Sequence, residues 1–209
     1  MPSPSAALRL FRHPISGHCH RAELLLSILR LPHHLVDVAF GDFPAEVKQH
    51  NRFGQIPVLQ DGDTFLADSS AILVYLASQY DPSRRWLPTE PRRAAEVTRW
   101  LSVAAGPLAY GPAAARVTVL FGRDTDLAPM HAIATRLFNV LELELAQRAF
   151  LVGDEPTIAD LAHYAYVARA PEGKLSLEPY PGVRAWLRRI EALPGFVPMV
   201  ATAMPPVAA

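Results

Sequence analysis

A serine and a cysteine three positions apart, near the start of the chain, have types and a spacing that suggest chemistry. They lie in the stretch PISGHCHRAELLL, residues 14–26, where Cys19 is the only cysteine of the sequence and Ser16 precedes it. This is the spacing of a C-x-x-C redox motif with serine in the leading place. Three alternatives follow: a reactive thiol at Cys19, a hydroxyl at Ser16 that donates a hydrogen bond to a bound group, or no chemistry at either residue.

The expected start of a helix near Gly17 would allow Ser16 to stabilise a bound thiolate. Serine is favoured as an N-cap, and a thiolate beside it would receive an O–H hydrogen bond. Lowering a thiol pKa from about 8.5 by about two units requires roughly 2.7 kcal/mol. A hydrogen bond to a charged group contributes about 1.5–3 kcal/mol, and a helix end about 0.3–1 kcal/mol. No general base is needed, because the thiolate is itself the nucleophile.

Cys19 and the histidines around it favour packing over catalysis or metal binding. A free cysteine is usually buried, so Cys19 is expected to be a packed thiol. His18 and His20 are two positions apart on a helix and do not face each other. The sequence contains no H-x-x-x-H or C-x-x-C frame, and no metal site is expected. For His18, both a hydrogen bond to a thiol and a place on the surface stay open.

The composition is that of an ordinary globular protein and narrows the classes of partner. The chain has 209 residues, 50% of them hydrophobic, with 20 Lys+Arg and 20 Asp+Glu. Without a basic excess, nucleic acid is not an expected partner. The start of the sequence has no secretory pattern, and glycines and prolines interrupt the uncharged segment 101–115 well short of a membrane span. A cytoplasmic protein that does not bind membranes is expected.

Strand and helix patterns alternate in residues 1–80, which are expected to form one domain. Strand patterns cover 7–11 and 34–40, and helical patterns cover 23–30 and 69–80. The first helix leaves room for a right-handed crossover between parallel strands. Two further apolar runs flank Asp61-Gly62, a pair typical of hairpin turns.

Strand signals stop after a proline-rich linker at 81–91, and residues 92–209 are expected to be all-helical. Helical patterns cover 92–121, 127–150, 157–170 and 181–193, and the last residues, 204–209, are expected to fray. Thr157 and Asp160 have the spacing of a capping box, which is structural and carries no chemistry.

Four short motifs, in this order along the chain, resemble those of a known family. They are SGHCHR (16–21), GQIPVL (54–59), ADSSAI (67–72) and TIADLA (157–162). A β-α-β-α-β-β-α unit with a proline at the start of its third strand resembles the thioredoxin fold. An all-helical domain behind it looks like the cytosolic glutathione S-transferase family. The resemblance implies an α/β thioredoxin-like N-terminal domain followed by an all-α helical bundle.

By this resemblance the first domain binds glutathione as a co-substrate. Ser16 would stabilise its thiolate, since family members that use cysteine keep it in the leading place, where this chain has serine. A cis bond between Ile56 and Pro57 would turn the Ile56 backbone toward the peptide, and Gln55 would contact the glycine end. Taken alone, Pro57 is equally a strand-opening proline whose missing N–H costs no ladder bond.

The same resemblance assigns the two ends of glutathione. Asp68 and Ser69 would hold the γ-glutamyl amine and carboxylate, although both residues are also ordinary helix caps. The family usually has Glu or Gln where Asp68 stands. Lys48 is the nearest candidate for the glycine carboxylate and Arg52 is another, with a solvated charge as the simpler interpretation of either.

The family binds its electrophile between the domains, against the long helix expected at 92–121. Tyr110 and Arg116 are the polar side chains placed to meet such a ligand. Trp100, Leu108 and Phe121 are expected in the core. The Gly-Pro pairs at 106–107 and 111–112 should kink or break the helix.

The leading hypothesis is a glutathione S-transferase, a detoxification enzyme that adds the thiolate to small hydrophobic electrophiles, acting as a homodimer by resemblance. Glutathione-dependent reduction of peroxides or disulfides uses the same thiolate and is the alternative within that class. A glutathione-binding or interaction protein without catalysis is the alternative of another class, because fold does not fix function.

Overall fold

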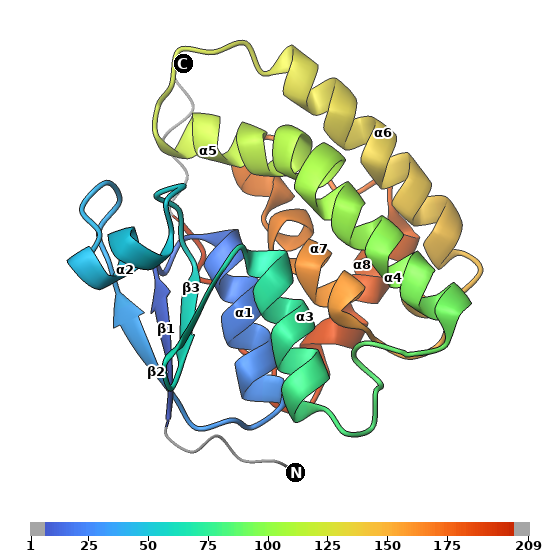
Figure 1. Cartoon of the computed structure of the whole chain (residues 1–209). Coiled ribbons are helices and arrows are strands. Elements are labelled where there is room, and N and C mark those ends of the chain that lie inside the picture. The colour runs from blue at the N-terminus through green and yellow to red at the C-terminus, as the bar shows by residue number, and fades with distance from the viewer. Residues whose placement is uncertain (1–6, 203–209) are drawn as a thin grey trace.

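The computed structural model describes residues 7–202, which form a sheet domain followed by a bundle of helices (Figure 1). The sheet has the strand order β2-β1-β3-β4. Its strands are β1 (Leu8–Arg12), β2 (His33–Asp37), β3 (Val58–Asp61) and β4 (Thr64–Ala67). β1 pairs with β2 in parallel, and the other two pairs are antiparallel. The predicted fraying of 204–209 lies outside the described residues.

Both faces of this sheet are covered, because β1 carries large apolar side chains at successive positions. The covering helices are α1 (Gly17–Ile28), α2 (Ala45–His50) and α3 (Ser69–Tyr80). Leu10 belongs to the main core with the leucines of α1 and α3, whereas Phe11 belongs to a smaller cluster with Val47 of α2 and Val58. In Figure 1, α1 and α3 lie side by side between the sheet and the helical bundle.

The predicted strand 34–40 ends early, at Asp37. Its partner strand among residues 7–202, β1, ends at Arg12, so the pairing stops after a last backbone hydrogen bond from the Val38 N–H to the Arg12 oxygen at 2.8 Å. The chain then forms a loop that carries Phe40 and Phe43 toward the helical domain. The predicted hairpin is present, with Asp61 and Thr64 as its last pair.

Residues 81–90 connect α3 to the helical domain, whose first long helix is continuous. It comprises α4 (Pro91–Val103), the π-helical segment η1 (Ala104–Ala113) and α5 (Ala114–Leu120). The predicted break at the Gly-Pro pairs is therefore wrong, but the α-helix does give way to π-helical turns over the segment that contains both pairs. Pro107 and Pro112 lack the N–H of a normal α-helical turn, and the wider π-helical turns accommodate them without a break.

The remaining helices of this domain pack around α7 (Ile158–Ala168), which lies at its centre. They are α6 (Ala128–Leu145), the 3₁₀ turn η2 (Ala170–Gly173) and α8 (Pro181–Glu191). Nearly every residue of α7 is buried. Trp100 and Leu108 are in the core as predicted. The prediction that Phe121 is in the core is wrong, because Phe121 lies just past the end of α5 and is 50% exposed.

The start of α7 is fixed by the predicted capping box. The fully buried Asp160 accepts hydrogen bonds from the backbone N–H of Thr157 at 2.8 Å and of Leu151 at 2.9 Å. It also accepts one from the indole Nε1 of Trp186 in α8 at 2.9 Å. One carboxylate therefore joins the cap of α7, the loop before it and α8.

Replacing Asp160 by alanine should destabilise the fold severely. Three buried donors would lose their acceptor, and each unsatisfied donor costs about 1–3 kcal/mol. We expect urea unfolding to show a loss of at least about 3 kcal/mol, with Asp160→Asn in between. Asp154→Ala, an exposed aspartate of the preceding loop, is the matched control and should stay within about 0.5 kcal/mol of wild type. An Asp160→Ala midpoint near that of the control would contradict this role.

Candidate active site

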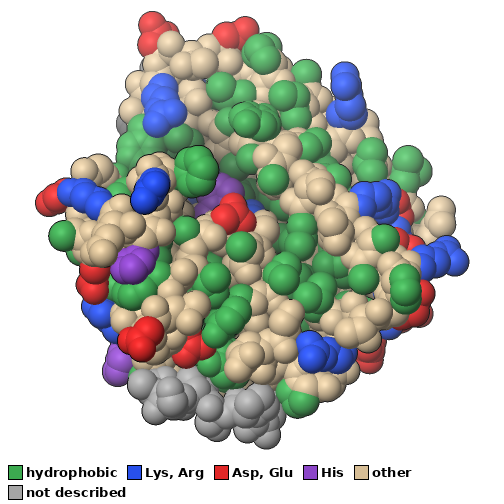
Figure 2. All heavy atoms as spheres, viewed as in Figure 1, with side chains coloured by type: hydrophobic (Ala, Val, Ile, Leu, Met, Phe, Trp, Pro, Cys, Tyr) green, Lys and Arg blue, Asp and Glu red, His purple; other side chains and the backbone are tan. Residues whose placement is uncertain are grey.

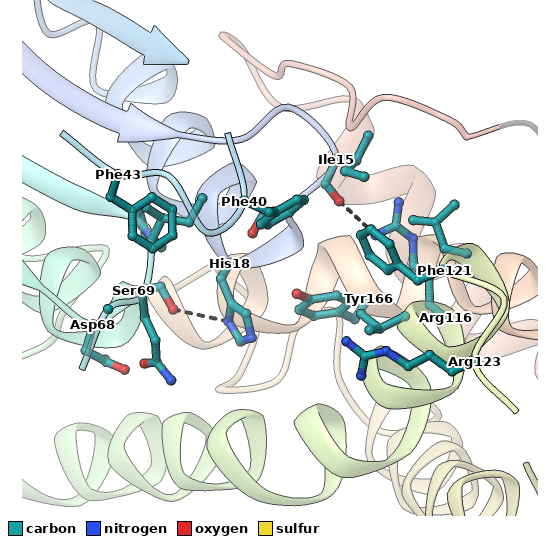
Figure 3. A pocket seen from close by; sticks show the side chains of 17 residues that line it. Ile15, His18, Phe40, Phe43, Asp68, Ser69, Arg116, Phe121, Arg123 and Tyr166 are labelled. Carbon is teal, nitrogen blue, oxygen red and sulfur yellow. Dashed lines mark hydrogen bonds between the residues drawn. The ribbon is translucent and has the colours of Figure 1, made fainter. Parts of the chain in front are cut away.

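A cavity of about 470 Å³ lies between the sheet domain and the α5 end of the helical domain. The surface in Figure 2 is hollowed at this place, and Figure 3 shows the side chains that line it. The cavity brings together most of the residues that the sequence singled out. They are Ser16, His18, Gln55, Ile56, Pro57, Asp68, Ser69 and Arg116.

Ser16 is the N-cap of α1 and borders the cavity. Its backbone is extended, at φ −84° and ψ 118°, and its Oγ accepts the backbone N–H of Cys19 at 3.3 Å. The hydroxyl also hydrogen-bonds the Cys19 thiol, so a ligand in the cavity would receive the Ser16 hydrogen in place of that thiol. Capping and ligand binding are therefore compatible at this residue.

Cys19 is fully buried and does not line the cavity. Its Sγ lies 3.5 Å from the backbone N of His13, which donates to it. Burial raises the pKa of the Cys19 thiol to about 11, and the hydrogen bonds from Ser16 and His13 offset only part of that effect. The prediction of a packed thiol is confirmed.

His18 lies in the cavity wall rather than on the outer surface. Its Nδ1 is 3.4 Å from Ser69 Oγ, and its ring meets that of Tyr166 edge to face with centroids 5.0 Å apart. Burial, with a smaller contribution from the Arg21 guanidinium, lowers the pKa of His18 to about 3. The imidazole is therefore neutral at physiological pH and offers one N–H for donation.

The segment before β3 has the conformation that the resemblance implied. The Ile56-Pro57 bond is cis, and Gln55 and Ile56 border the cavity beside it. Asn51, which is buried, holds this turn by donating from Nδ2 to the backbone oxygen of Gln55 at 2.6 Å. The sequence analysis did not single out Asn51, whose role depends on the conformation of the loop.

Asp68 and Ser69 begin α3 at the opposite side of the cavity from α5 (Figure 3). Asp68 Oδ1 accepts the backbone N–H groups of Ser70 at 2.8 Å and Ala71 at 3.0 Å. Ser69 Oγ accepts from Nη1 of Arg21 at 3.2 Å. Arg21 is fully buried, and among residues 7–202 no carboxylate pairs with its guanidinium. The Arg21 guanidinium lies directly behind Ser69, and the nearby Asp68 carboxylate favours its charge.

Arg116 lines the cavity, but most of its hydrogen-bond donors are used within the protein. It is 2% exposed; its Nε donates to Glu172 at 2.7 Å and its Nη1 donates to the backbone oxygen of Ile15 at 2.8 Å. Only Nη2 is without a partner within the described chain. Arg116 thus attaches α5 to the residue that precedes Ser16.

Two predicted residues lie elsewhere. The Lys48 side chain is 57% exposed, lies 3.9 Å from Asp42 and does not line the cavity. Tyr110 is 68% exposed and lines a different groove, between η1 and α6, because it projects from the outer side of the long helix.

The cavity also contains residues that sequence reasoning missed, chiefly Phe40, Tyr166 and Arg123. Tyr166 packs over the start of α1: a Cβ at Gly17 would lie 2.7 Å from its Cζ. Glycine in the first turn of a helix is the one signal in the sequence that could have indicated this close approach. Phe40 and Arg123 belong to loops, for which the sequence contains no comparable signal.

Residues 7–202 contain neither a cluster of metal ligands nor a helix that could span a membrane. No group of three or more His, Cys, Asp or Glu side chains is arranged to hold a metal ion in this part of the chain. Among the same residues, no helix combines the length and the apolar character that crossing a bilayer requires.

Comparison with known proteins agrees with this geometry. The models of the glutathione S-transferase N-terminal and C-terminal domains match residues 10–84 and 130–194. Glutathione S-transferase 3 of Zea mays is 34% identical over 94% of each chain. The crystal structure of a glutathione S-transferase from Pseudomonas fluorescens superposes with a TM-score of 0.86, at 32% identity, covering 94% of this chain and 100% of that one. Glutathione S-transferase GstB of Escherichia coli is 30% identical over 86% of this chain and 90% of its own length.

The chain therefore belongs to the glutathione S-transferase family. The predicted combination of a thioredoxin-like domain and an all-helical domain is confirmed.

The burial of Cys19 predicts that native protein is inert to thiol reagents. With a pKa of about 11, only about one thiol in a thousand is ionised at pH 8, and the sulfur has no path to solvent. An aromatic disulfide reagent should release no chromophore from folded protein within minutes and one equivalent per chain in urea. Prompt labelling of the native protein would contradict a sealed thiol.

Proposed function

We propose that the protein is a glutathione transferase in which the Ser16 hydroxyl donates a hydrogen bond to the glutathione thiolate. The observation that carries this is the placement of two neighbouring groups. Ser16 borders the cavity at the N-cap of α1, while Cys19, one turn later, is sealed in the core. Ser16 also lies at the N-terminus of α1, where the helix dipole favours negative charge.

The peptide would be held along the sheet side of the cavity. The cis Ile56-Pro57 segment exposes the Ile56 backbone to the cysteinyl unit, with Gln55 toward the glycine end. The ammonium of the γ-glutamyl unit would pair with Asp68, and its carboxylate with Ser69. The buried Arg21 supports that polarity, because its unpaired charge lies 3.2 Å behind the Ser69 hydroxyl.

The reaction needs no protein base. Bound glutathione releases its thiol proton to solvent, and the thiolate, stabilised by Ser16, forms a carbon–sulfur bond with the electrophile. The leaving group departs with the electrons of the broken bond or, in an addition, the neighbouring carbon takes up a proton. Neutral His18 is placed to donate a second hydrogen bond near the sulfur.

Ser16→Ala should raise the thiol pKa of bound glutathione. Loss of one hydrogen bond to a charged group costs about 1.5–3 kcal/mol, which corresponds to roughly one to two pKa units. We expect kcat/KM at pH 6.5 to fall about 10- to 100-fold, and the thiolate absorbance of bound glutathione to appear at higher pH.

Two variants serve as controls for the Ser16→Ala experiment. Ser102→Ala, an exposed serine of α4, should leave the absorbance titration unchanged, and Cys19→Ala should retain activity if it folds. Unchanged turnover in Ser16→Ala would rule out the Ser16 mechanism. Glutathione that binds wild type with an ordinary thiol pKa would favour a non-catalytic binding protein.

We further infer that the protein is a homodimer that covers the groove containing Tyr110. This groove of about 470 Å³ is lined mainly by apolar side chains of α4, η1 and α6, with Arg99 and Arg136 among them. Tyr110, Ile133 and Val140 are exposed there, and Figure 2 shows hydrophobic side chains on this upper part of the molecule. Exposed apolar patches of this kind mark association surfaces.

Val140→Glu should weaken the association, because it places a charge inside the apolar contact. Sedimentation velocity at micromolar concentration should show a dimer for wild type and half that mass for the variant. Val200→Glu, which replaces an exposed valine outside the groove, is the matched control. A monomeric wild type would contradict the proposal.

A further inference from the structure

The α5 end of the cavity is shaped for a flat aromatic group. Phe40 stacks on His13 with ring centroids 4.0 Å apart and meets Phe121 edge to face at 5.8 Å. Val117 and Leu120 complete this part of the wall with aliphatic surface. Aromatic rings favour stacked and edge-to-face neighbours, so a planar ligand ring has partners on more than one side here.

The same end of the cavity carries positive charge. Arg116 is neutralised by Glu172, but its buried Nη2 has no partner among residues 7–202. Arg123 has neither an ion pair nor a side-chain hydrogen bond within that range. Its Cζ lies 5.9 Å from the centroid of the Phe121 ring. Figure 3 shows the Arg123 side chain extending from the end of α5 toward Tyr166.

A helix-ending motif positions Arg123. After Phe121, Gly122 takes a φ of +57°, its N–H bonds to the oxygen of Val119 at 3.2 Å, and the N–H of Arg123 bonds to that of Thr118 at 2.9 Å. This is the pair of bonds of a Schellman motif, which requires a left-handed residue and therefore favours glycine. The motif turns the chain back at the cavity rim and fixes the backbone that carries the guanidinium.

Glutathione does not account for this charge. In the binding mode proposed above, both of its carboxylates lie on the sheet side, toward Ser69 and Gln55. Asp68 is the only carboxylate that borders the cavity among residues 7–202, and it lies at the far end from Arg123. The guanidinium is therefore left for the second substrate.

We propose that this enzyme prefers aromatic electrophiles that carry a carboxylate, and that Arg123 is the residue that determines this specificity. The inference rests on the proposed transferase function. The Arg123 guanidinium would pair with the carboxylate while the ring lies against Phe40 and Phe121. A planar guanidinium matches a carboxylate in geometry as well as in charge.

A matched pair of substrates tests the proposal: 4-chloro-3-nitrobenzoate and 4-chloro-3-nitrobenzamide. With each, the glutathione thiolate forms a bond to the chlorine-bearing carbon, chloride leaves with the electrons of the broken bond, and the thiol proton goes to solvent. The readout is the ratio of kcat/KM for acid and amide, each divided by its uncatalysed rate. Wild type should favour the acid, and Arg123→Gln should lower the ratio roughly tenfold, as expected for the loss of one charged hydrogen bond.

Three further variants and a salt series test whether the preference depends on the Arg123 charge. Arg123→Lys should keep part of the preference, and Arg123→Glu should reverse it. Arg93→Gln, an exposed arginine at the start of α4, is the matched control and should change neither substrate. The wild-type preference should shrink between 50 and 500 mM salt, since an exposed ion pair is screened. An acid-to-amide ratio of one, or a ratio unaffected by Arg123→Gln, would overturn the inference while leaving the transferase function intact.

Calorimetric binding of the two glutathione conjugates distinguishes a failure of the proposed transferase function from a failure of the proposed Arg123 specificity. If wild type turns over neither substrate, a conjugate of the acid that still binds about tenfold more tightly than that of the amide, with the difference lost in Arg123→Gln, would support the site without the catalysis. Equal binding of both conjugates would overturn the proposed specificity directly, and no binding of either would overturn both proposals.

Discussion

The buried Arg116–Glu172 pair is the constraint on which the geometry of the cavity depends. Its guanidinium joins three parts of the chain that are remote in sequence: α5, the 3₁₀ turn η2, and the loop that ends at Ile15. Ile15 immediately precedes Ser16. The helical domain therefore fixes the backbone next to Ser16, the residue proposed to donate a hydrogen bond to the glutathione thiolate. A buried ion pair is costly to break, because removal of one partner leaves the other charge without compensation.

Orientation within a single helical turn separates the two residues that could do chemistry. The Ser16 hydroxyl oxygen accepts the Cys19 backbone N–H, and the hydroxyl also hydrogen-bonds the Cys19 thiol. Ser16 faces the cavity, while burial raises the pKa of Cys19 to about 11. The two residues therefore lie within one turn at the start of α1, one at the cavity and the other in the core.

Features set by local interactions could be predicted from the sequence, and those set by distant contacts could not. Helix 69–80 was predicted residue for residue, because Asp68 caps it, and the capping box of Thr157 and Asp160 is equally local. Arg116 was placed correctly at the cavity, but its partner Glu172 is remote in sequence and its structural role was invisible. Tyr110 was assigned to the wrong groove, since helical spacing alone does not tell which side of a long helix faces another domain.

The close approach of Tyr166 to Gly17 links two positions that lie in different domains. A Cβ at position 17 would lie 2.7 Å from the tyrosine ring, so position 17 can carry a side chain only if the ring shifts or is replaced by a smaller residue. Among homologous chains, a larger residue at the first position should therefore be accompanied by a smaller one at the second. Since Tyr166 forms part of the cavity wall, each such exchange would also deepen the cavity, and substrate size could diverge between lineages through this single pair.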